Sequence, residues 1–181
     1  MKELSLHILD IAQNSVRAGA SLIRIEITED EETLTFSISD NGCGMDEAFL
    51  RAVTDPFTTT RTTRGVGLGI PLLKLSCEST GGAFSISSRT DENHGTVTTA
   101  SFIKTHIDYT PLGDMTDTVC TLVQGSPTLH FIYRHTYLGR EVSLDTEMIR
   151  RALGDEISLA EPEILLWIRE SLNEEYQKLK L

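Results

Sequence analysis

Apolar and polar positions follow two different periods along the first hundred residues. Apolar side chains recur at helical spacing across residues 3–18, and this pattern predicts an amphipathic helix. Two alternating stretches separated by an acidic turn follow, and they predict a β-hairpin of half-buried strands. Shorter helices are expected at residues 46–53 and 70–79. The strands expected in this part of the chain cover residues 22–28, 33–39, 83–89 and 96–103.

The pattern changes after the last of these strands, and we divide the chain into a domain of residues 1–104 and a small α+β module of residues 105–181. In the module, Asp145 can cap one helix that ends at Gly154, and Pro162 suits the first turn of another. The strands and helices expected here cover residues 119–123, 128–134, 146–153 and 162–179.

Aromatic and aliphatic side chains of the module are interpreted as packing residues. Three aromatics straddle one strand and its turn, and core or hairpin packing is the favoured role for them over a cofactor site. The last helix carries an apolar face that either covers the sheet or binds a partner chain, and core packing is favoured. These residues are Phe131, Tyr133 and Tyr137 in the strand, and Ile164, Leu165, Ile168 and Leu172 in the helix.

Composition indicates an ordinary globular protein whose charge limits its partners. Apolar residues make up 39% and charged residues 24% of the 181 residues, so disorder is not expected. The net charge of −11 disfavours nucleic acid as a partner, because an acidic surface repels a phosphate backbone. A bound nucleotide would need local shielding of its phosphates by Mg²⁺ and backbone N–H groups.

Cysteine usage and hydropathy predict a cytoplasmic protein. Cys43, Cys77 and Cys120 have no metal-ligating spacing, and so small a set of cysteines is typical of reduced thiols. The start of the chain leads into an amphipathic pattern, so no signal peptide is expected. No apolar run approaches the roughly 20 residues that a membrane span needs, so we expect no membrane partner.

The first helix carries two polar residues one turn apart, Asp10 and Asn14. An asparagine offers a carbonyl oxygen that suits a hard cation such as Mg²⁺. A carboxylate one turn earlier can orient or deprotonate a water beside that ion. Taken alone, the same pair also fits an exposed helix with ordinary polar residues.

A glycine-rich turn follows the second strand, at Asp40-Asn41-Gly42-Cys43-Gly44. Glycines let a backbone approach a flat ligand closely. An ionised carboxylate accepts hydrogen bonds without donating them, so Asp40 can bind an amino group such as that of adenine. A simple Asp-Asn-Gly turn is the alternative.

A long polar loop of residues 54–69 ends in three alternating glycines, Gly65, Gly67 and Gly69. Glycines at a helix start can present several N–H groups to phosphates. The spacing matches neither a dinucleotide fingerprint nor a P-loop. A Gly-Thr pair that ends in Thr96 begins a later strand, and alone it is uninformative.

In their order and spacing these four motifs resemble the GHKL superfamily, which includes DNA gyrase B, the ninety-kilodalton heat-shock chaperones, histidine kinases and MutL. Residues 14–20 and the turn at residues 40–44 look especially like MutL. Residues 56–60 and 65–70 look more like the histidine kinases. The resemblance covers about residues 3–104.

The resemblance implies an α+β Bergerat-type fold, a two-layer α/β sandwich in which helices cover one face of a mixed sheet. It also implies ATP and Mg²⁺ as cofactors. Asn14 would ligate Mg²⁺, and Asp40 would bind the adenine amino group with a water that Thr96 also holds. Gly42 and Gly44 would let the adenine approach. The implied phosphate-binding and lid residues are Gly65, Gly67, Leu68 and Gly69, with Arg61 or Arg64 reaching the γ-phosphate.

Two departures from the family pattern shape the functional hypothesis. Asp10 stands where the family usually has glutamate, and a displacement of about 1 Å in a catalytic group can cost about a hundredfold in rate. ATP binding is thus better supported than hydrolysis. The chain starts at the first ATP-site helix, so we do not expect the phospho-accepting helical hairpin of sensor kinases.

The leading hypothesis is a stand-alone histidine-kinase-like protein kinase or regulatory domain that acts on a protein partner. The alternatives are a MutL-like ATPase switch and a non-catalytic ATP sensor that binds a protein partner. Asp10 is the candidate catalytic residue in the first two. A homodimer is compatible with each of them.

Overall fold

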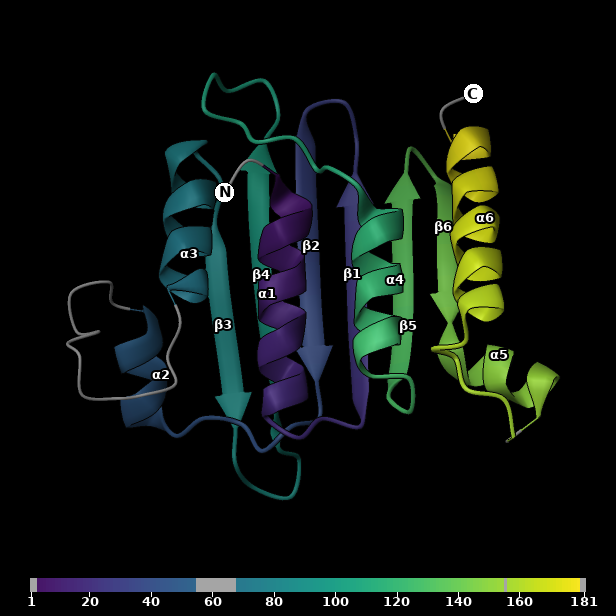
Figure 1. Ribbon diagram of the computed structural model, residues 1–181. Coiled ribbons are helices and arrows are strands. Elements are labelled where there is room, and N and C mark those ends of the chain that lie inside the picture. Colours follow the sequence, from purple (N-terminus) through teal and green to yellow (C-terminus); the bar gives the residue numbers. More distant parts are fainter. Residues whose placement is uncertain (1–2, 55–67, 155, 180–181) are drawn as a thin grey trace.

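The computed structural model describes residues 3–54, 68–154 and 156–179, which form one six-stranded sheet with helices against it (Figure 1). The strand order is β3-β4-β2-β1-β5-β6. Neighbouring strands are antiparallel except β1 and β5, which are parallel, so the sheet is mixed. The strands are β1 (Leu22–Glu29), β2 (Thr33–Asp40), β3 (Phe84–Arg89), β4 (Gly95–Ile103), β5 (His130–Tyr137) and β6 (Arg140–Asp145).

Helices cover one face of this sheet. The order across that face is α3, α1, α4 and α6, with the shorter α2 and α5 toward its two lateral edges (Figure 1). This is the expected α+β two-layer sandwich with a mixed sheet. The helices are α1 (Leu4–Arg17), α2 (Glu47–Thr54), α3 (Gly69–Ser79), α4 (Met115–Gly125), α5 (Thr146–Leu153) and α6 (Pro162–Leu179).

One expected strand is wrong: residues 119–123 lie inside helix α4. The Asp114 side chain caps this helix by accepting a hydrogen bond from the Asp117 N–H (2.8 Å). Met115, Val119 and Leu122 are buried at helical spacing. A short apolar run is ambiguous between a buried strand and a buried helix, and here the cap and the longer period decide for the helix.

The core lies between the sheet and the helices, and it is built by alternating strand positions. In β1, Ile23, Ile25 and Ile27 are buried under the helices, whereas Arg24 and Glu26 point to the open face. Burying each such aliphatic side chain stabilises the fold by about 1.5–3 kcal/mol. The alternation predicted from the sequence thus sets which face the helices cover.

Strand β5 lies directly against β1, so residues 105–181 add two strands to the same sheet. Phe131 is opposite Ile23 and Tyr133 is opposite Ile25 in the parallel register. Both aromatic side chains are buried, and their predicted packing role is confirmed. Strands from both sides of residue 104 form one continuous sheet. The division of the chain there into two folding units stays a prediction.

The last helix, α6, packs as expected. Ile168 and Leu172 are buried, while Ile164 and Leu165 are partly buried against the same core. Trp167 is half-exposed beside them. Of the helices in the described residues, none has the length and apolar character that crossing a membrane requires.

A partly buried polar network joins β1, β5 and α6. Glu29 accepts hydrogen bonds from Lys104 Nζ (2.6 Å) and from His135 Nε2 (3.1 Å). His135 Nδ1 accepts in turn from the Tyr176 hydroxyl (2.9 Å). Burial alone would raise the pKa of Glu29, but the bonds from His135 and Lys104 outweigh it and lower that pKa below its ordinary value of 4.5. The ionised carboxylate therefore holds the C-terminal strands and helix to the rest of the sheet.

We predict that Glu29→Gln lowers the free energy of unfolding at pH 7 by about 2 kcal/mol, measured by urea denaturation. Because the folded-state pKa of Glu29 is depressed, its contribution is complete above pH 4.5 and is lost as the pH falls through the folded value. The difference between the two proteins should shrink over that window. Glu26→Gln is the matched control, since Glu26 is exposed on the same strand. Equal losses in both variants, or a difference that persists at acid pH, would contradict this role.

Candidate nucleotide-binding site

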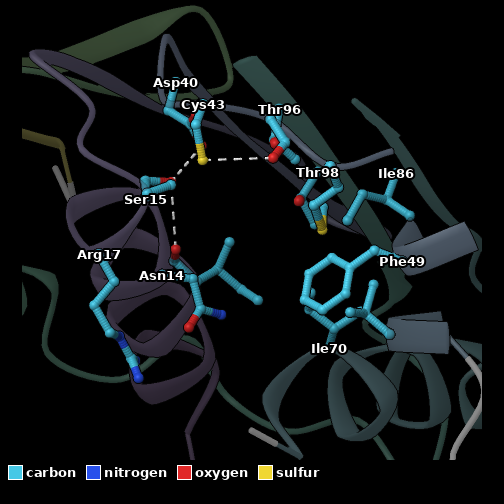
Figure 2. A pocket seen from close by; sticks show the side chains of 15 residues that line it. Asn14, Ser15, Arg17, Asp40, Cys43, Phe49, Ile70, Ile86, Thr96 and Thr98 are labelled. Carbon is cyan, nitrogen blue, oxygen red and sulfur yellow. Dashed lines mark hydrogen bonds between the residues drawn. The ribbon is translucent and has the colours of Figure 1, made fainter. Parts of the chain in front are cut away.

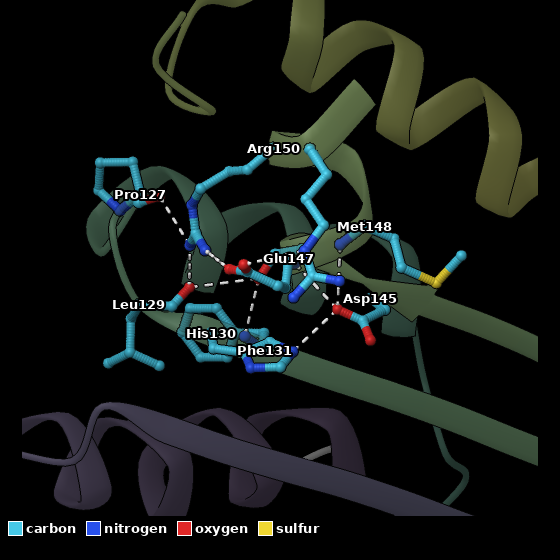
Figure 3. Close-up of polar contacts among 10 residues, drawn as sticks. Pro127, Leu129, His130, Phe131, Asp145, Glu147, Met148 and Arg150 are labelled. Atoms are coloured by element: carbon cyan, nitrogen blue, oxygen red, sulfur yellow. Dashed lines mark hydrogen bonds and ion pairs between the residues drawn. The ribbon is translucent and has the colours of Figure 1, made fainter. Parts of the chain in front are cut away.

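A cavity of about 270 Å³ lies where α1 meets the carboxyl end of β2 (Figure 2). This volume is close to the lower end of the range for small-molecule sites, about 300–1,000 Å³. Of the predicted ligand-binding residues, Asn14, Asp40, Gly44 and Thr96 line it. Motifs separated by about eighty positions in the sequence are therefore brought to one cavity.

Asp40, the last residue of β2, is fixed at the edge of the cavity by two hydrogen bonds. Its Oδ2 accepts from the Ser15 hydroxyl on α1 (2.5 Å), and its Oδ1 accepts from the Gly42 N–H (2.9 Å). Each carboxylate oxygen has two lone pairs, so both can accept a further hydrogen bond from a ligand. Asp40 is thus a pre-oriented acceptor. Sequence reasoning did not single out Ser15, although its place one residue after Asn14 puts it beside the same site.

The turn after Asp40 is held on both sides by close backbone contacts that require its glycines. A Cβ on Gly42 would lie 2.8 Å from the Ala18 Cβ, and a Cβ on Gly44 would lie 1.8 Å from the Arg89 carbonyl oxygen. Gly44 also has a φ of +72°, which disfavours other residues. The glycines therefore let this turn pack between α1 and β3. Their role in adenine approach stays a prediction.

Thr96 lies directly opposite Asp40 in the β2–β4 pairing. Its hydroxyl is hydrogen-bonded to the Ser88 hydroxyl (2.8 Å), which also donates to the Gly95 carbonyl (3.0 Å). The pairing places the Thr96 side chain on the cavity wall beside Asp40, as the shared-water role requires. Sheet register is what makes a Gly-Thr pair informative here, and register is not visible in local sequence.

Apolar side chains form another part of the wall. Phe49 from α2 and Ile70 from α3 point into the cavity across from Asp40, and Ile86 from β3 lies beside Thr98 (Figure 2). A flat aromatic ligand can pack on such a surface while a polar edge meets the carboxylate. These three residues were missed, because isolated apolar positions carry no sequence signal for a ligand.

Helix α1 contributes the Arg17 guanidinium to the site, together with Asn14 and Asp10, whose side-chain oxygens suit a metal ion. Asn14 and Arg17 line the cavity, one turn apart on the helix. Arg17 Nη2 lies 4.0 Å from Asp10 Oδ1, in an exposed pair that contributes little stability. Arg17 is a further residue that sequence reasoning missed. A guanidinium here suits a phosphate group.

Asp10 lies against the first residue of α3. A Cβ added to Gly69 would be 1.7 Å from Asp10 Oδ2, so the carboxylate in this position packs against the glycine and would have to move to admit a side chain. The structure therefore brings Asp10 to the start of the helix that follows the predicted phosphate loop. Like charges repel, so a phosphate close to Asp10 would need a cation between them.

The residues present fit Mg²⁺ bound together with phosphate. The Asn14 amide oxygen is a hard ligand on the cavity wall. Within the described ranges, no group of three histidine, cysteine, aspartate or glutamate side chains forms a metal site of its own. Mg²⁺ commonly takes one or two protein ligands and completes its shell with phosphate oxygens and water.

Part of the predicted site lies outside the described residues, and it stays a prediction. This applies to Arg61, Arg64, Gly65 and Gly67. Leu68 is described, and it is exposed just before α3. Phosphate binding by Leu68 and Gly69 also stays a prediction.

Comparison with known proteins places this site in a family. Residues 2–106 match the family model described as histidine kinase-, DNA gyrase B-, and HSP90-like ATPase. The chain is 35% identical over 96 residues to the tetrathionate sensor histidine kinase TtrS of Salmonella typhimurium. It is 30% identical over 104 residues to sporulation kinase A of Bacillus subtilis. These matches span 52% and 58% of this chain but only 16% of each relative.

Solved structures show the same fold at low sequence identity. The MutL ATPase domain of Aquifex aeolicus, complexed with ADP, superposes with a TM-score of 0.53 and 14% identity over 84% of this chain and 69% of that one. The N-terminal domain of a DNA repair protein gives a TM-score of 0.52 at 18% identity, over 80% and 53% of the two chains. Both superpositions exceed the length of residues 2–106, so the shared fold extends into the C-terminal part. Because the family model matches more than half of the chain and the structures share its fold, this protein belongs to the histidine kinase-, DNA gyrase B-, and HSP90-like ATPases.

Proposed function

We propose that the chain binds Mg-ATP in the cavity beside Asp40 and acts as a histidine-kinase-like protein kinase or regulatory domain. The observation that best supports nucleotide binding is the position of the Asp40 carboxylate. Ser15 and Gly42 hold it at the edge of a cavity with partly apolar walls. An adenine ring presents both a flat apolar face and an exocyclic amino donor. Asp40 can accept from that donor while Thr96 holds a water beside it.

The α1 residues would serve the phosphate end of the ligand. The Asn14 amide oxygen would hold Mg²⁺, and Arg17 would neutralise phosphate charge from the same face of the helix. Bound Mg²⁺ supplies the charge neutralisation on which phosphoryl transfer depends. Asp10, one turn before Asn14, would orient the accepting hydroxyl, imidazole or water.

Kinase activity is favoured by the sequence relatives. Two of them are named as a sensor histidine kinase and a sporulation kinase, at 35% and 30% identity. The chain spans about a sixth of their length, so their activities come to this protein only as a proposal. The substrate that we propose for such a kinase is a serine, threonine or histidine of a protein partner.

A conformational ATPase switch is the second candidate, and the structural match favours it. The similarity to the ADP-complexed MutL ATPase domain covers 84% of this chain and so includes part of the C-terminal strands and helices. In such a switch, nucleotide would change the contacts of the module with a second copy or another protein. A sensor that binds ATP without chemistry is the remaining alternative, because Asp10 is shorter than the usual glutamate.

We predict that Asp40→Asn raises the dissociation constant for ATP by about 10- to 100-fold in calorimetric titrations, because an amide nitrogen replaces one acceptor oxygen. Asp108→Asn is the matched control, since Asp108 is an exposed aspartate in the loop after β4. The control should bind ATP like the unchanged protein. If Asp40→Asn binds ATP normally, the adenine site lies elsewhere.

Cys43 offers a second test, because it is the exposed cysteine and it lines the cavity, whereas Cys77 and Cys120 are buried. Saturating Mg-ATP should slow alkylation of Cys43 by N-ethylmaleimide at least about tenfold, followed by peptide mass spectrometry. Burial raises the pKa of the Cys77 and Cys120 thiols, so those residues are slow internal controls. Asp40→Asn should need about 10- to 100-fold more ATP for the same protection. Unprotected Cys43 at an ATP concentration that saturates the protein would place the nucleotide outside this cavity.

The three candidate activities are separated by incubating the purified protein with γ-labelled ATP and Mg²⁺, with and without cell extract. Kinase activity predicts label on a protein, and we expect it to disappear in Asn14→Ala, which removes the oxygen proposed to ligate Mg²⁺. Free phosphate without labelled protein supports the switch instead. Neither product, together with measured ATP binding, supports the sensor.

A further inference from the structure

The glycine-rich turn that follows Asp40 contacts the β3–β4 hairpin as well as α1. A Cβ on Gly95 would lie 2.1 Å from the Asp40 carbonyl oxygen, so the start of β4 presses directly on this turn. The Met45 N–H donates to the Ser88 hydroxyl (2.8 Å) at the far end of the turn. Between these two contacts, one more side chain of the hairpin reaches the turn, and that side chain is His94.

His94 Nδ1 lies 2.7 Å from the Gly42 carbonyl oxygen. A carbonyl oxygen only accepts hydrogen bonds, so Nδ1 must carry the proton and donate it. The donor atom comes from a residue 52 positions away in the chain. The peptide unit that carries this carbonyl is also held through the Cys43 N–H, which donates to the Ala18 carbonyl (2.9 Å). The His94 bond is therefore the restraint on Gly42 from the β3–β4 side, opposite the one from α1.

Gly42 is also the residue that orients the Asp40 carboxylate. Its N–H donates to Asp40 Oδ1 (2.9 Å), while its carbonyl accepts from His94. One residue thus carries both hydrogen bonds, and a rotation of Gly42 would move the N–H away from Asp40. His94 is exposed and is not part of the cavity wall, so it acts on the ligand only through Gly42.

We propose that His94 is a positioning residue for nucleotide binding: its Nδ1–H holds Gly42 and thereby aims the Asp40 carboxylate at the adenine amino group. This inference rests on the proposed nucleotide site. It adds a residue that belongs to none of the four motifs and lies two positions before Thr96. The same hairpin therefore supplies both the wall residue Thr96 and the restraint on the turn after the neighbouring Asp40.

Two amide variants of His94 test this role, because their side-chain nitrogens lie at different distances from the backbone. In His94→Asn the side-chain nitrogen occupies nearly the position of Nδ1, whereas in His94→Gln it lies one bond farther out. We expect His94→Ala and His94→Gln to weaken ADP binding about five- to tenfold, and His94→Asn to stay within about twofold of the unchanged protein. Titration calorimetry with Mg-ADP measures this, and circular dichroism establishes that each variant is folded.

A second readout is the protonation of the ring itself. Long-range ¹⁵N NMR of the unchanged protein should show His94 with its proton on Nδ1 at neutral pH, as donation to Gly42 requires. Equal binding by His94→Ala and the unchanged protein, or equal losses in His94→Asn and His94→Gln, would overturn the positioning role. Absence of ADP binding by the unchanged protein would overturn the proposed function as well, so the two failures are distinguishable.

Discussion

The hydrogen bond between Ser15 and Asp40 joins the helical layer to the sheet at the edge of the cavity that α1 and β2 line. It exists because the apolar stripe of α1 is buried against β1 and β2, which turns Asn14 and Ser15 toward the end of β2. Without that packing, Asp40 would be one more exposed aspartate in a glycine-rich turn. The site is therefore a consequence of how two layers meet.

Close backbone contacts then make the turn rigid. Gly42 fits against Ala18, and Gly44 fits against Arg89, so the turn is trapped between the end of α1 and the end of β3. A rigid acceptor binds more tightly than a mobile one, because less conformational freedom is lost when the ligand arrives. Gly69 likewise lies close to the Asp10 carboxylate, whose side chain would have to move if a Cβ were added there.

Much of this arrangement could be predicted from the sequence. Amphipathic periodicity predicted the elements of residues 3–54 and 68–104 nearly at their observed bounds, and the family resemblance that four motifs carry implied a shared site for Asn14, Asp40 and Thr96. Long-range pairing could not be predicted in this way. Nothing local indicates that Phe131 lies beside Ile23, or that β5 is parallel to β1, because such pairing depends on the whole chain.

The misassigned segment and the missed residues have related causes. Val119 and its neighbours fit a strand or a helix equally well over five positions, and only the Asp114 cap and the longer pattern distinguish the two. Phe49, Ile70 and Ile86 form the apolar wall through tertiary packing, which no motif encodes. Arg17 looked like an ordinary helix-end cation until the cavity placed it beside Asn14.

The C-terminal strands give the protein a wider sheet than the matched segment of residues 2–106 contains. Glu29, Lys104 and His135 connect the two parts, and the strand that carries Glu29 pairs with the strand that ends at Asp40.

The central claim is that Asp40 receives the adenine of a bound nucleotide, and a crystal structure of the protein with Mg-ADP tests it most directly. The account predicts the adenine amino nitrogen within about 3 Å of an Asp40 oxygen, a hydrogen-bond distance, with the ring packed beside Ile86 and the phosphates toward Asn14 and Arg17. An ADP molecule bound anywhere else, or bound here with its adenine turned away from Asp40, would contradict it.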